Sequence, residues 1–122
     1  MVSPRAAAIT FKKNNESEQR ALTKRREAAQ AEGRRLAKKI LQEHPETLRV
    51  WGFGSTYEIW RHYRLDSDID VAAERGSAYE LLKSVETSDF KVDVISMEEI
   101  PASLAGFIRQ QGTVLAEVED GR

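Results

Sequence analysis

Two aspartates separated by one residue, Asp68 and Asp70, are the side chains of this sequence best placed to hold a metal ion. They open a short apolar segment that is typical of a β-strand. Because side chains alternate between the two faces of a strand, both carboxylates lie on one face and Ile69 lies on the other. Two carboxylates this close repel each other unless a cation lies between them. Mg²⁺ is often bound by one or two carboxylates together with substrate phosphates, so the pair predicts magnesium-dependent chemistry on a phosphate compound.

A third aspartate, Asp93, stands between Val92 and Val94 in a second apolar segment that also predicts a strand. If this strand lies beside the first, Asp93 joins the other two carboxylates over one patch of sheet. Three carboxylates can hold two metal ions about 3.5–4 Å apart, which is the arrangement that stabilises the attacking and leaving oxygens in phosphoryl or nucleotidyl transfer. The alternative is that these aspartates bind no metal, because aspartates are common where a loop enters a strand. Asp93 fits this alternative less well, because it interrupts a strongly apolar run.

A glycine–serine turn, Gly54-Ser55, follows an apolar segment upstream of the aspartates. Glycine leaves the backbone N–H groups of a turn open to an anion because it has no Cβ. The sequence therefore predicts a phosphate-binding turn between two strands. Residues 56–60 are expected to begin a short helix whose N-terminus faces the phosphates.

The order Gly-Ser, spacer, Asp-x-Asp and a later single Asp on a strand resembles the nucleotidyltransferases of the polymerase-beta type. The short chain and the Ser67-Asp68-Ile69-Asp70 motif look most like the minimal nucleotidyltransferase (MNT) domains. Those domains are the antitoxins of two-gene prokaryotic modules whose toxin is a helical HEPN-domain ribonuclease. The resemblance covers residues 49–116.

The resemblance implies a Mg²⁺-dependent enzyme with two ions that transfers NMP, with AMP as the expected group, from ATP or another NTP to a hydroxyl. The implied acceptor is a tyrosine of a cognate HEPN toxin, which the transfer would silence. The implied catalytic and metal-binding residues are Asp68, Asp70 and Asp93, and the implied nucleotide-binding residues are Gly54, Ser55 and Ser67.

The segment after Ser55 differs from the pattern of the minimal domains, which usually continue with a small residue and then Ala-Arg-Gly. Here the spacer is about two residues longer and the usual arginine is absent, which leaves Arg61 and Arg64 as the cations that could reach the phosphates. This difference keeps a second hypothesis open, in which the chain is a non-catalytic antitoxin that neutralises its partner by forming a complex. A third hypothesis is an RNA-directed transferase that uses a basic helix.

The composition indicates a single domain of 122 residues without cysteine, which fits a reducing cytoplasm, and no apolar run long enough for a membrane span. Residues 1–50 carry a net charge of +6 and residues 51–122 one of −7. The contrast suggests an interaction surface or an internal match. No aromatic residues lie among the basic ones, so a nucleic-acid partner is not expected. Whether the chain forms a homo- or hetero-oligomer stays open.

The expected organisation is one nucleotidyltransferase domain between two less ordered ends. The ranges are an irregular N-terminal segment at 1–13, a domain at 14–118 made of a long helix at 14–44 and a catalytic palm at 48–118, and a frayed tail at 119–122.

The expected fold class is α/β (α+β), a polymerase-beta-like nucleotidyltransferase palm with a long N-terminal helix. Its small mixed β-sheet carries the acids on one face and helices on the other. Alternating or continuous apolar patterns predict strands at 48–53, 68–73 and 90–95 and helices at 78–86 and 103–111. Residues 113–118 fit either an edge strand or the end of a helix.

Overall fold

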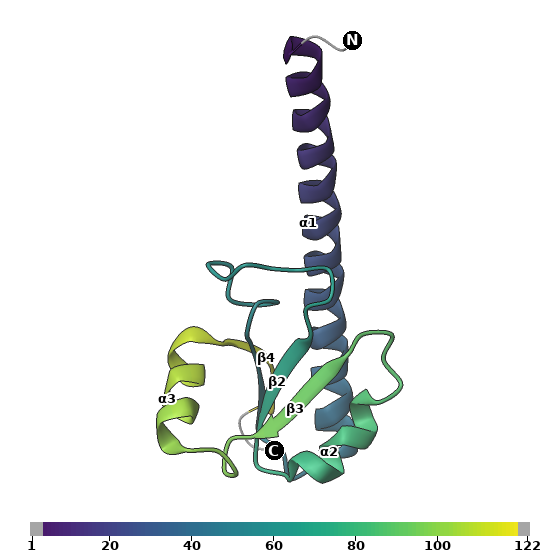
Figure 1. Ribbon diagram of the computed structural model, residues 1–122. Coiled ribbons are helices and arrows are strands. Elements are labelled where there is room, and N and C mark those ends of the chain that lie inside the picture. The colour runs from purple at the N-terminus through teal and green to yellow at the C-terminus, as the bar shows by residue number, and fades with distance from the viewer. Residues whose placement is uncertain (1–3, 120–122) are drawn as a thin grey trace.

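The computed structural model describes residues 4–119, and their side chains from residue 15 onward. Three helices and a four-stranded sheet make up the described fold (Figure 1). The elements are α1 (Pro4–Glu43), β1 (Arg49–Phe53), β2 (Ile69–Glu74), α2 (Ala78–Val85), β3 (Val92–Ser96), α3 (Ala102–Gln111) and β4 (Thr113–Glu117). The predicted fold class, a small mixed sheet with a long N-terminal helix, is confirmed.

The sheet has the strand order β3-β2-β1-β4. The strand β1 is antiparallel to both β2 and β4, whereas β2 and β3 are parallel. A parallel pair needs a crossover connection, and α2 supplies it here. Residues 113–117 form the edge strand β4, so this segment is an edge strand and not the end of a helix.

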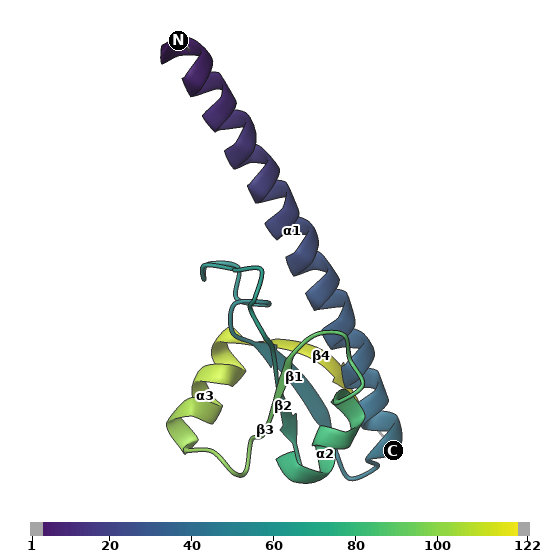
Figure 2. The same cartoon turned by 45° about the vertical axis from the view of Figure 1, so that its right-hand side comes forward.

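One face of the sheet is covered by α1 and α2, which lie side by side behind the strands (Figure 2). Apolar side chains from these helices meet those that alternate along the strands. The fully buried members of this core are Ala29, Leu36, Ala37, Ile40, Val50, Ile69, Val71, Ala73 and Leu81.

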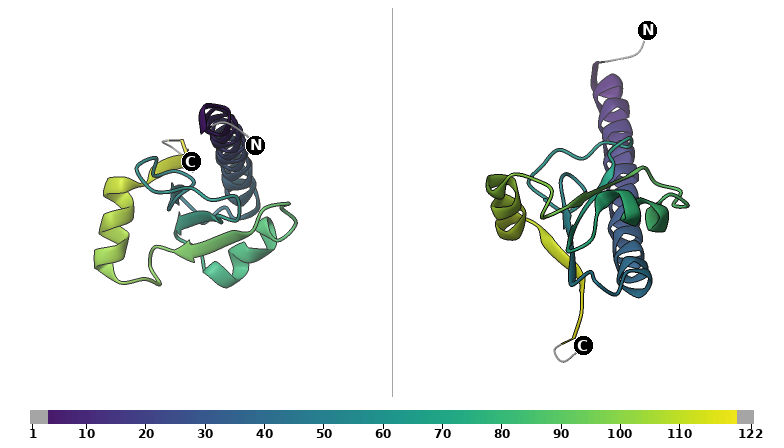
Figure 3. Two further views of the ribbon diagram at one scale, coloured as in Figure 1. Left: turned by 45° about the horizontal axis from the view of Figure 1, so that its top comes forward. Right: turned by 90° about the horizontal axis from the view of Figure 1, so that it is seen from below.

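The third helix, α3, lies on the opposite face of the sheet from α1 and α2 (Figure 3). Its Ala105 and Ile108 are buried against Ala72 and Met97 in a second, smaller core. The expectation that all helices pack on one face is therefore wrong for α3. The two small side chains of Ala72 and Ala105 leave room for a helix on the face that carries the acids, and sequence periodicity cannot assign a helix to one face of a sheet.

The helix α1 has 40 residues, so it is about 60 Å long at about 1.5 Å per residue. Among the described side chains of α1, which begin at residue 15, the first that is fully buried is Ala29, and the N-terminal half of the helix projects beyond the sheet (Figures 1 and 2). The prediction of an irregular segment at 1–13 is wrong for residues 4–13, which are helical. Pro4 stands at the first helical position, where proline is favoured, and Ala6-Ala7-Ala8 are the strongest helix formers.

The predicted tail at 119–122 lies outside the described residues except for Glu119, which belongs to no helix or strand. Within the described part of the chain, none of the helices combines the length and the apolarity that crossing a membrane requires.

We predict that Gly33→Ala destabilises the fold, although alanine normally stabilises the interior of a helix. A Cβ at Gly33 would collide with the hydroxyl of Tyr57, whose ring packs against α1. Overpacking of this kind costs about 1–3 kcal/mol. Gly106→Ala is the control, because nothing lies within 4 Å of a Cβ built at that glycine of α3. That change should stabilise the protein by up to about 1 kcal/mol. Urea unfolding of both variants measures whether each change lowers or raises the free energy of unfolding. A stabilised Gly33→Ala variant contradicts the packing of Tyr57 against α1.

Candidate functional site

Parallel pairing of β2 with β3 places Asp70 directly opposite Asp93. Both strands alternate, so Ile69 and Val92 point into the core while the two aspartates occupy the other face. The half-buried Asp70 lies inside the sheet and the exposed Asp93 lies on the edge strand. The structure therefore brings together two of the three aspartates expected from the sequence.

Asp70 lies in an environment that disfavours its charge. Burial, followed by the nearby Asp93 and Asp68 carboxylates, raises its pKa from an ordinary 3.8 to about 7. A hydrogen bond with Asp93 and the charge of Glu58 add to the effect. A half-buried carboxyl surrounded by three other acids is a place where a cation would be stabilised.

Asp68 stands at the entry to β2, one residue before the strand begins. Its Oδ2 lies 3.7 Å from Nζ of Lys91, and its backbone oxygen accepts a hydrogen bond of 2.9 Å from the hydroxyl of Thr56. Within the described part of the chain, no group of three or more Asp, Glu, His or Cys side chains is gathered closely enough to hold a metal ion by itself. Asp70 and Asp93 thus form the centre of the acidic site and Asp68 lies at its margin.

The glycine turn lies directly beside Asp70. Gly54 follows Phe53, the residue of β1 that pairs with Asp70, and it has a φ of +72°, which glycine adopts without strain. A Cβ at this position would collide with the Asp70 carboxylate. The glycine is therefore required both by the backbone conformation and by the close approach of the acid.

The two serines of the predicted nucleotide-binding set have structural partners. The backbone oxygen of Ser55 accepts two hydrogen bonds, of 2.9 and 2.5 Å, from Nε and Nη2 of Arg26. The hydroxyl of Ser67 accepts a 2.9 Å hydrogen bond from the backbone N–H of Arg64, which stabilises the turn before β2. Ser55 follows the glycine that lies against Asp70, whereas Ser67 stabilises the turn before β2.

Residues 55–61 form irregular turns, so the short helix predicted at 56–60 is wrong. The reason is competition for carbonyl oxygens. Arg26 of α1 also donates to the backbone oxygens of Glu58 and Arg61, both at 3.1 Å, and Gln30 donates to that of Thr56 at 2.9 Å. The side chains of α1 thus take the acceptors that a helix would use, and they fix the turn onto α1.

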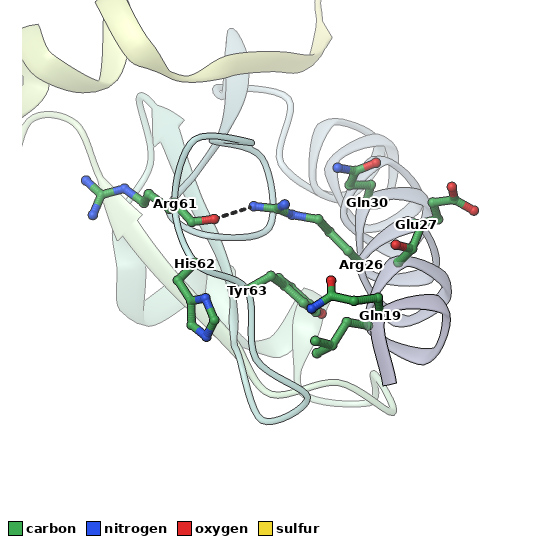
Figure 4. Close-up of a pocket in the computed structure, with 9 residues that line it drawn as sticks. Gln19, Arg26, Glu27, Gln30, Arg61, His62 and Tyr63 are labelled. Carbon is green, nitrogen blue, oxygen red and sulfur yellow. Dashed lines mark hydrogen bonds between the residues drawn. The ribbon is translucent and has the colours of Figure 1, made fainter. Parts of the chain in front are cut away.

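A cavity of about 410 Å³ lies between α1 and the segment that follows the turns (Figure 4). Arg26 crosses it to reach the backbone oxygen of Arg61, and Tyr63 is buried at its floor with its ring 5.2 Å from the Arg26 guanidinium. None of the aspartates lines it. The residues around it are Gln19, Leu22, Thr23, Arg26, Glu27, Gln30, Arg61, His62 and Tyr63.

Glu58 is the residue of the site that sequence reasoning missed. Its side chain is 1% exposed, and its Oε2 accepts a hydrogen bond from the backbone N–H of Gly54 and lies 3.1 Å from Nε of Arg61. Its Oε1 is buried without a hydrogen-bond partner in the described part of the chain. The feature of the sequence that could have indicated Glu58 is its charge, since it stands between Tyr57 and Ile59, four positions after Gly54.

No protein-family model matches the chain, and no curated protein matches it. Solved structures of other proteins do match the chain. A toxin–antitoxin complex with AMP-PNP matches with 25% identity over 66% of this chain and 70% of that chain, with a TM-score of 0.54. A mutant toxin–antitoxin complex matches with 21% identity over 66% and 70%, at a TM-score of 0.52. A complex of a tri-AMPylated HEPN toxin with an MNT antitoxin from Shewanella oneidensis matches with 20% identity over 76% and 73%, at a TM-score of 0.51.

These similarities confirm the resemblance to the minimal nucleotidyltransferase antitoxins that the motifs indicated. The matches at 20% and 21% identity establish the shared fold, and the match at 25% supports a relationship to toxin–antitoxin proteins. The order of the motifs Gly-Ser, Asp-x-Asp and Asp led us to expect this fold, and the chain has it.

We predict that Asp70→Asn stabilises the metal-free protein at pH 8. The unfolded chain ionises this carboxyl near 3.8, whereas the folded state keeps it protonated until about pH 7. The folded state therefore binds more protons in between, so stability falls as pH rises through that window and stays lower above it. Allowing for solvent screening, the gain is on the order of 1–2 kcal/mol.

The measurement is urea unfolding in EDTA from pH 4 to pH 8, with Asp66→Asn as the control because Asp66 is an exposed acid. The difference between wild type and Asp70→Asn should grow across the window and then level off. Mg²⁺ added at pH 8 should stabilise wild type more than the variant. A difference that is constant from pH 4 to pH 8 contradicts the assignment.

Proposed function

We propose that this chain is the antitoxin of a HEPN-type module and acts as a Mg²⁺-dependent nucleotidyltransferase. It transfers NMP, with AMP as the expected group, from an NTP to a hydroxyl, and the acceptor is a tyrosine of a cognate HEPN toxin in the cytoplasm. The observation that carries the proposal is the pairing of Asp70 with Asp93 beside a glycine turn in a fold shared with toxin–antitoxin proteins.

The residues present fit a magnesium ion. Asp70 and Asp93 offer the hard oxygen ligands that Mg²⁺ prefers, and one or two carboxylates plus substrate phosphates are its usual protein environment. The pKa of Asp70 is raised by burial first and by the Asp93 and Asp68 carboxylates next, and a bound cation would oppose these effects. When bound, Mg²⁺ would neutralise the triphosphate and lower the pKa of the attacking hydroxyl. Asp68 and Asp70 would bind both ions, and Asp93 would complete the second metal site.

The chain's own residues supply the rest of the proposed reaction. The acceptor oxygen forms a bond to the α-phosphorus, the bond to the pyrophosphate oxygen breaks, and pyrophosphate leaves. The carboxylate of Asp93, which is exposed to an incoming acceptor, takes the hydroxyl proton. Gly54 and Ser55 hold the β- and γ-phosphates at the end of β1. The palm that orients these groups spans residues 48–118.

The acceptor assignment is supported by what the similar structures contain. One holds a HEPN toxin that carries three AMP groups together with an MNT antitoxin, and another holds a toxin–antitoxin complex with AMP-PNP. By analogy with these, the partner of this chain is a HEPN toxin and the donor is ATP.

A second candidate function is a non-catalytic antitoxin that silences its partner by forming a complex. The observation that favours it is the Glu58 carboxylate, which accepts the backbone N–H of Gly54 at the turn where a phosphate would bind. An acid at that place opposes an anion, so nucleotide binding must overcome it.

We expect label transfer from α-³²P-ATP to a protein of toxin size when the chain is mixed with Mg²⁺ and a lysate of the organism that encodes it. Asp70→Asn or Asp93→Asn should reduce the transfer at least about 100-fold, because each removes a charge from the acidic pair that positions the phosphates. Asp68→Asn should also abolish transfer. Asp66→Asn is the matched control and should keep full activity, because its side chain is exposed and paired with Arg64.

A parallel reaction with γ-³²P-ATP separates nucleotidyl transfer from phosphoryl transfer, since only the α-label stays with the acceptor. Label that persists in a folded Asp70→Asn/Asp93→Asn double variant contradicts the acidic pair as the site. No label from any of the four α-³²P-nucleotides, in a chain that still neutralises its partner, supports the non-catalytic candidate instead.

A further inference from the structure

We propose that Arg61 is a phosphate-binding residue of this site and that Glu58 positions it. The inference rests on the proposed function, because it names the group that contacts the triphosphate of the donor. It goes beyond that function because Arg61 lies outside the Gly-Ser and Asp-x-Asp motifs and Glu58 carries a charge of the wrong sign for a phosphate site.

The guanidinium of Arg61 is fixed on two sides and open on the third. Its Nε lies 3.1 Å from Oε2 of Glu58, and its central carbon lies 4.5 Å from the centre of the Trp60 ring. The Arg61 side chain is 42% exposed, so part of its guanidinium is open to a ligand. A guanidinium held in this way presents a planar fork, the geometry that binds two phosphate oxygens at once.

Glu58 joins this fork to the glycine turn. One carboxylate oxygen accepts a hydrogen bond from the backbone N–H of Gly54 and forms an ion pair of 3.1 Å with Nε of Arg61. The carboxylate is buried, so its attraction for the guanidinium is weakened little by water. Gly54 in turn lies against the carboxylate of Asp70. A short chain of contacts therefore connects the Arg61 cation to the acidic pair.

The side chain of Arg61 points away from α1 (Figure 4). Its backbone oxygen faces α1 and accepts a hydrogen bond from Arg26, whereas its guanidinium extends away from α1 and from the cavity beside it (Figure 4). It thus lies on the side of the loop away from α1.

The other cations near the loop are less suited to this role. Arg26 is occupied by the backbone oxygens of the turns, as described above. Arg64 is 70% exposed and lies 3.4 Å from the exposed Asp66. Lys91 lies beside Asp68 and has no planar fork. Arg61 is the arginine of this loop that pairs with the Glu58 carboxylate beside Gly54 and is still 42% exposed.

The test is isothermal titration of the 122-residue chain with AMP-PNP and Mg²⁺, and separately with AMP. Arg61→Ala should weaken AMP-PNP binding about tenfold, the effect of one lost charge-assisted contact. AMP lacks the β- and γ-phosphates, so its binding should change less than twofold. Arg64→Ala is the matched control and should bind both ligands as wild type does.

The Glu58→Gln variant distinguishes a Glu58 that positions the Arg61 guanidinium from one that only repels the triphosphate. The change removes a negative charge beside the triphosphate, so a purely repulsive Glu58 predicts tighter AMP-PNP binding in the variant. A positioning Glu58 predicts weaker binding, about three- to tenfold, because the Arg61 guanidinium loses its buried anchor. The effects of Glu58→Gln and Arg61→Ala should then be strongly non-additive in the double variant, since both disrupt the same contact.

Thermal unfolding checks that each variant is folded. The Arg61→Lys variant keeps the charge but loses the planar fork, so its AMP-PNP affinity should lie between those of Arg61→Ala and wild type. Equal AMP-PNP affinities for Arg61→Ala, Arg64→Ala and wild type overturn this inference and leave the proposed function intact. Tighter binding by Glu58→Gln overturns the positioning role. A wild-type chain that binds no nucleoside triphosphate at millimolar concentrations overturns the proposed function, and the inference with it.

Discussion

The repulsion between carboxylates that the sheet forces together is the constraint on which the site depends. Parallel pairing of β2 and β3 sets Asp70 opposite Asp93, and burial of Asp70 makes its charge costly. Hydrogen-bonded strands cannot move apart to relieve this without losing the sheet. The backbone nearby is shaped by the same acid, because only a glycine at position 54 leaves room for the Asp70 carboxylate. The fold thus holds together two acids whose joint ionisation is costly.

The second requirement is a rigid turn beside these acids, and α1 provides it. The turns after Gly54 have only a few backbone hydrogen bonds of their own, such as the one from the Glu58 N–H to the Gly54 oxygen at 2.8 Å. Arg26 and Gln30 of α1 donate further hydrogen bonds to their backbone oxygens. Tyr57 anchors the same turns by packing against Gly33 and donating to the Gln30 backbone oxygen at 2.9 Å. Residues of α1 that look like an ordinary solvated basic face in the sequence therefore hold the proposed phosphate turn. The glycine inside the helix, a weak point by propensity, is the place where the tyrosine fits.

The strands, and the face of each strand that carries its acid, could be predicted from the sequence because both follow from local alternation of apolar and polar residues. That Asp70 and Asp93 meet was expected only on the condition that their strands are neighbours, which the fold supplies. The residues that the sequence did not reveal act over long separations in the chain. Arg26 prevents the helix expected at 56–60, and α3 packs on the acidic face because Ala72 and Ala105 are small. Glu58 looked like one charge among many, since only the fold shows that it is buried against Gly54. Patterns predict elements, whereas these contacts depend on where elements meet.

The charge of Glu58 also gives a physical reason for the longer spacer. Counted from Gly54, position 58 is where the minimal domains usually have their arginine, so this chain carries an acid in place of a base. A site meant for a triphosphate cannot tolerate that reversal unless a cation is restored nearby. In the proposed arrangement Arg61, which lies three residues later and 3.1 Å from the same carboxylate, restores it. On the proposed function, the extra residues supply the length that lets an arginine turn back onto Glu58, so the altered motif and the altered spacing are two parts of one change.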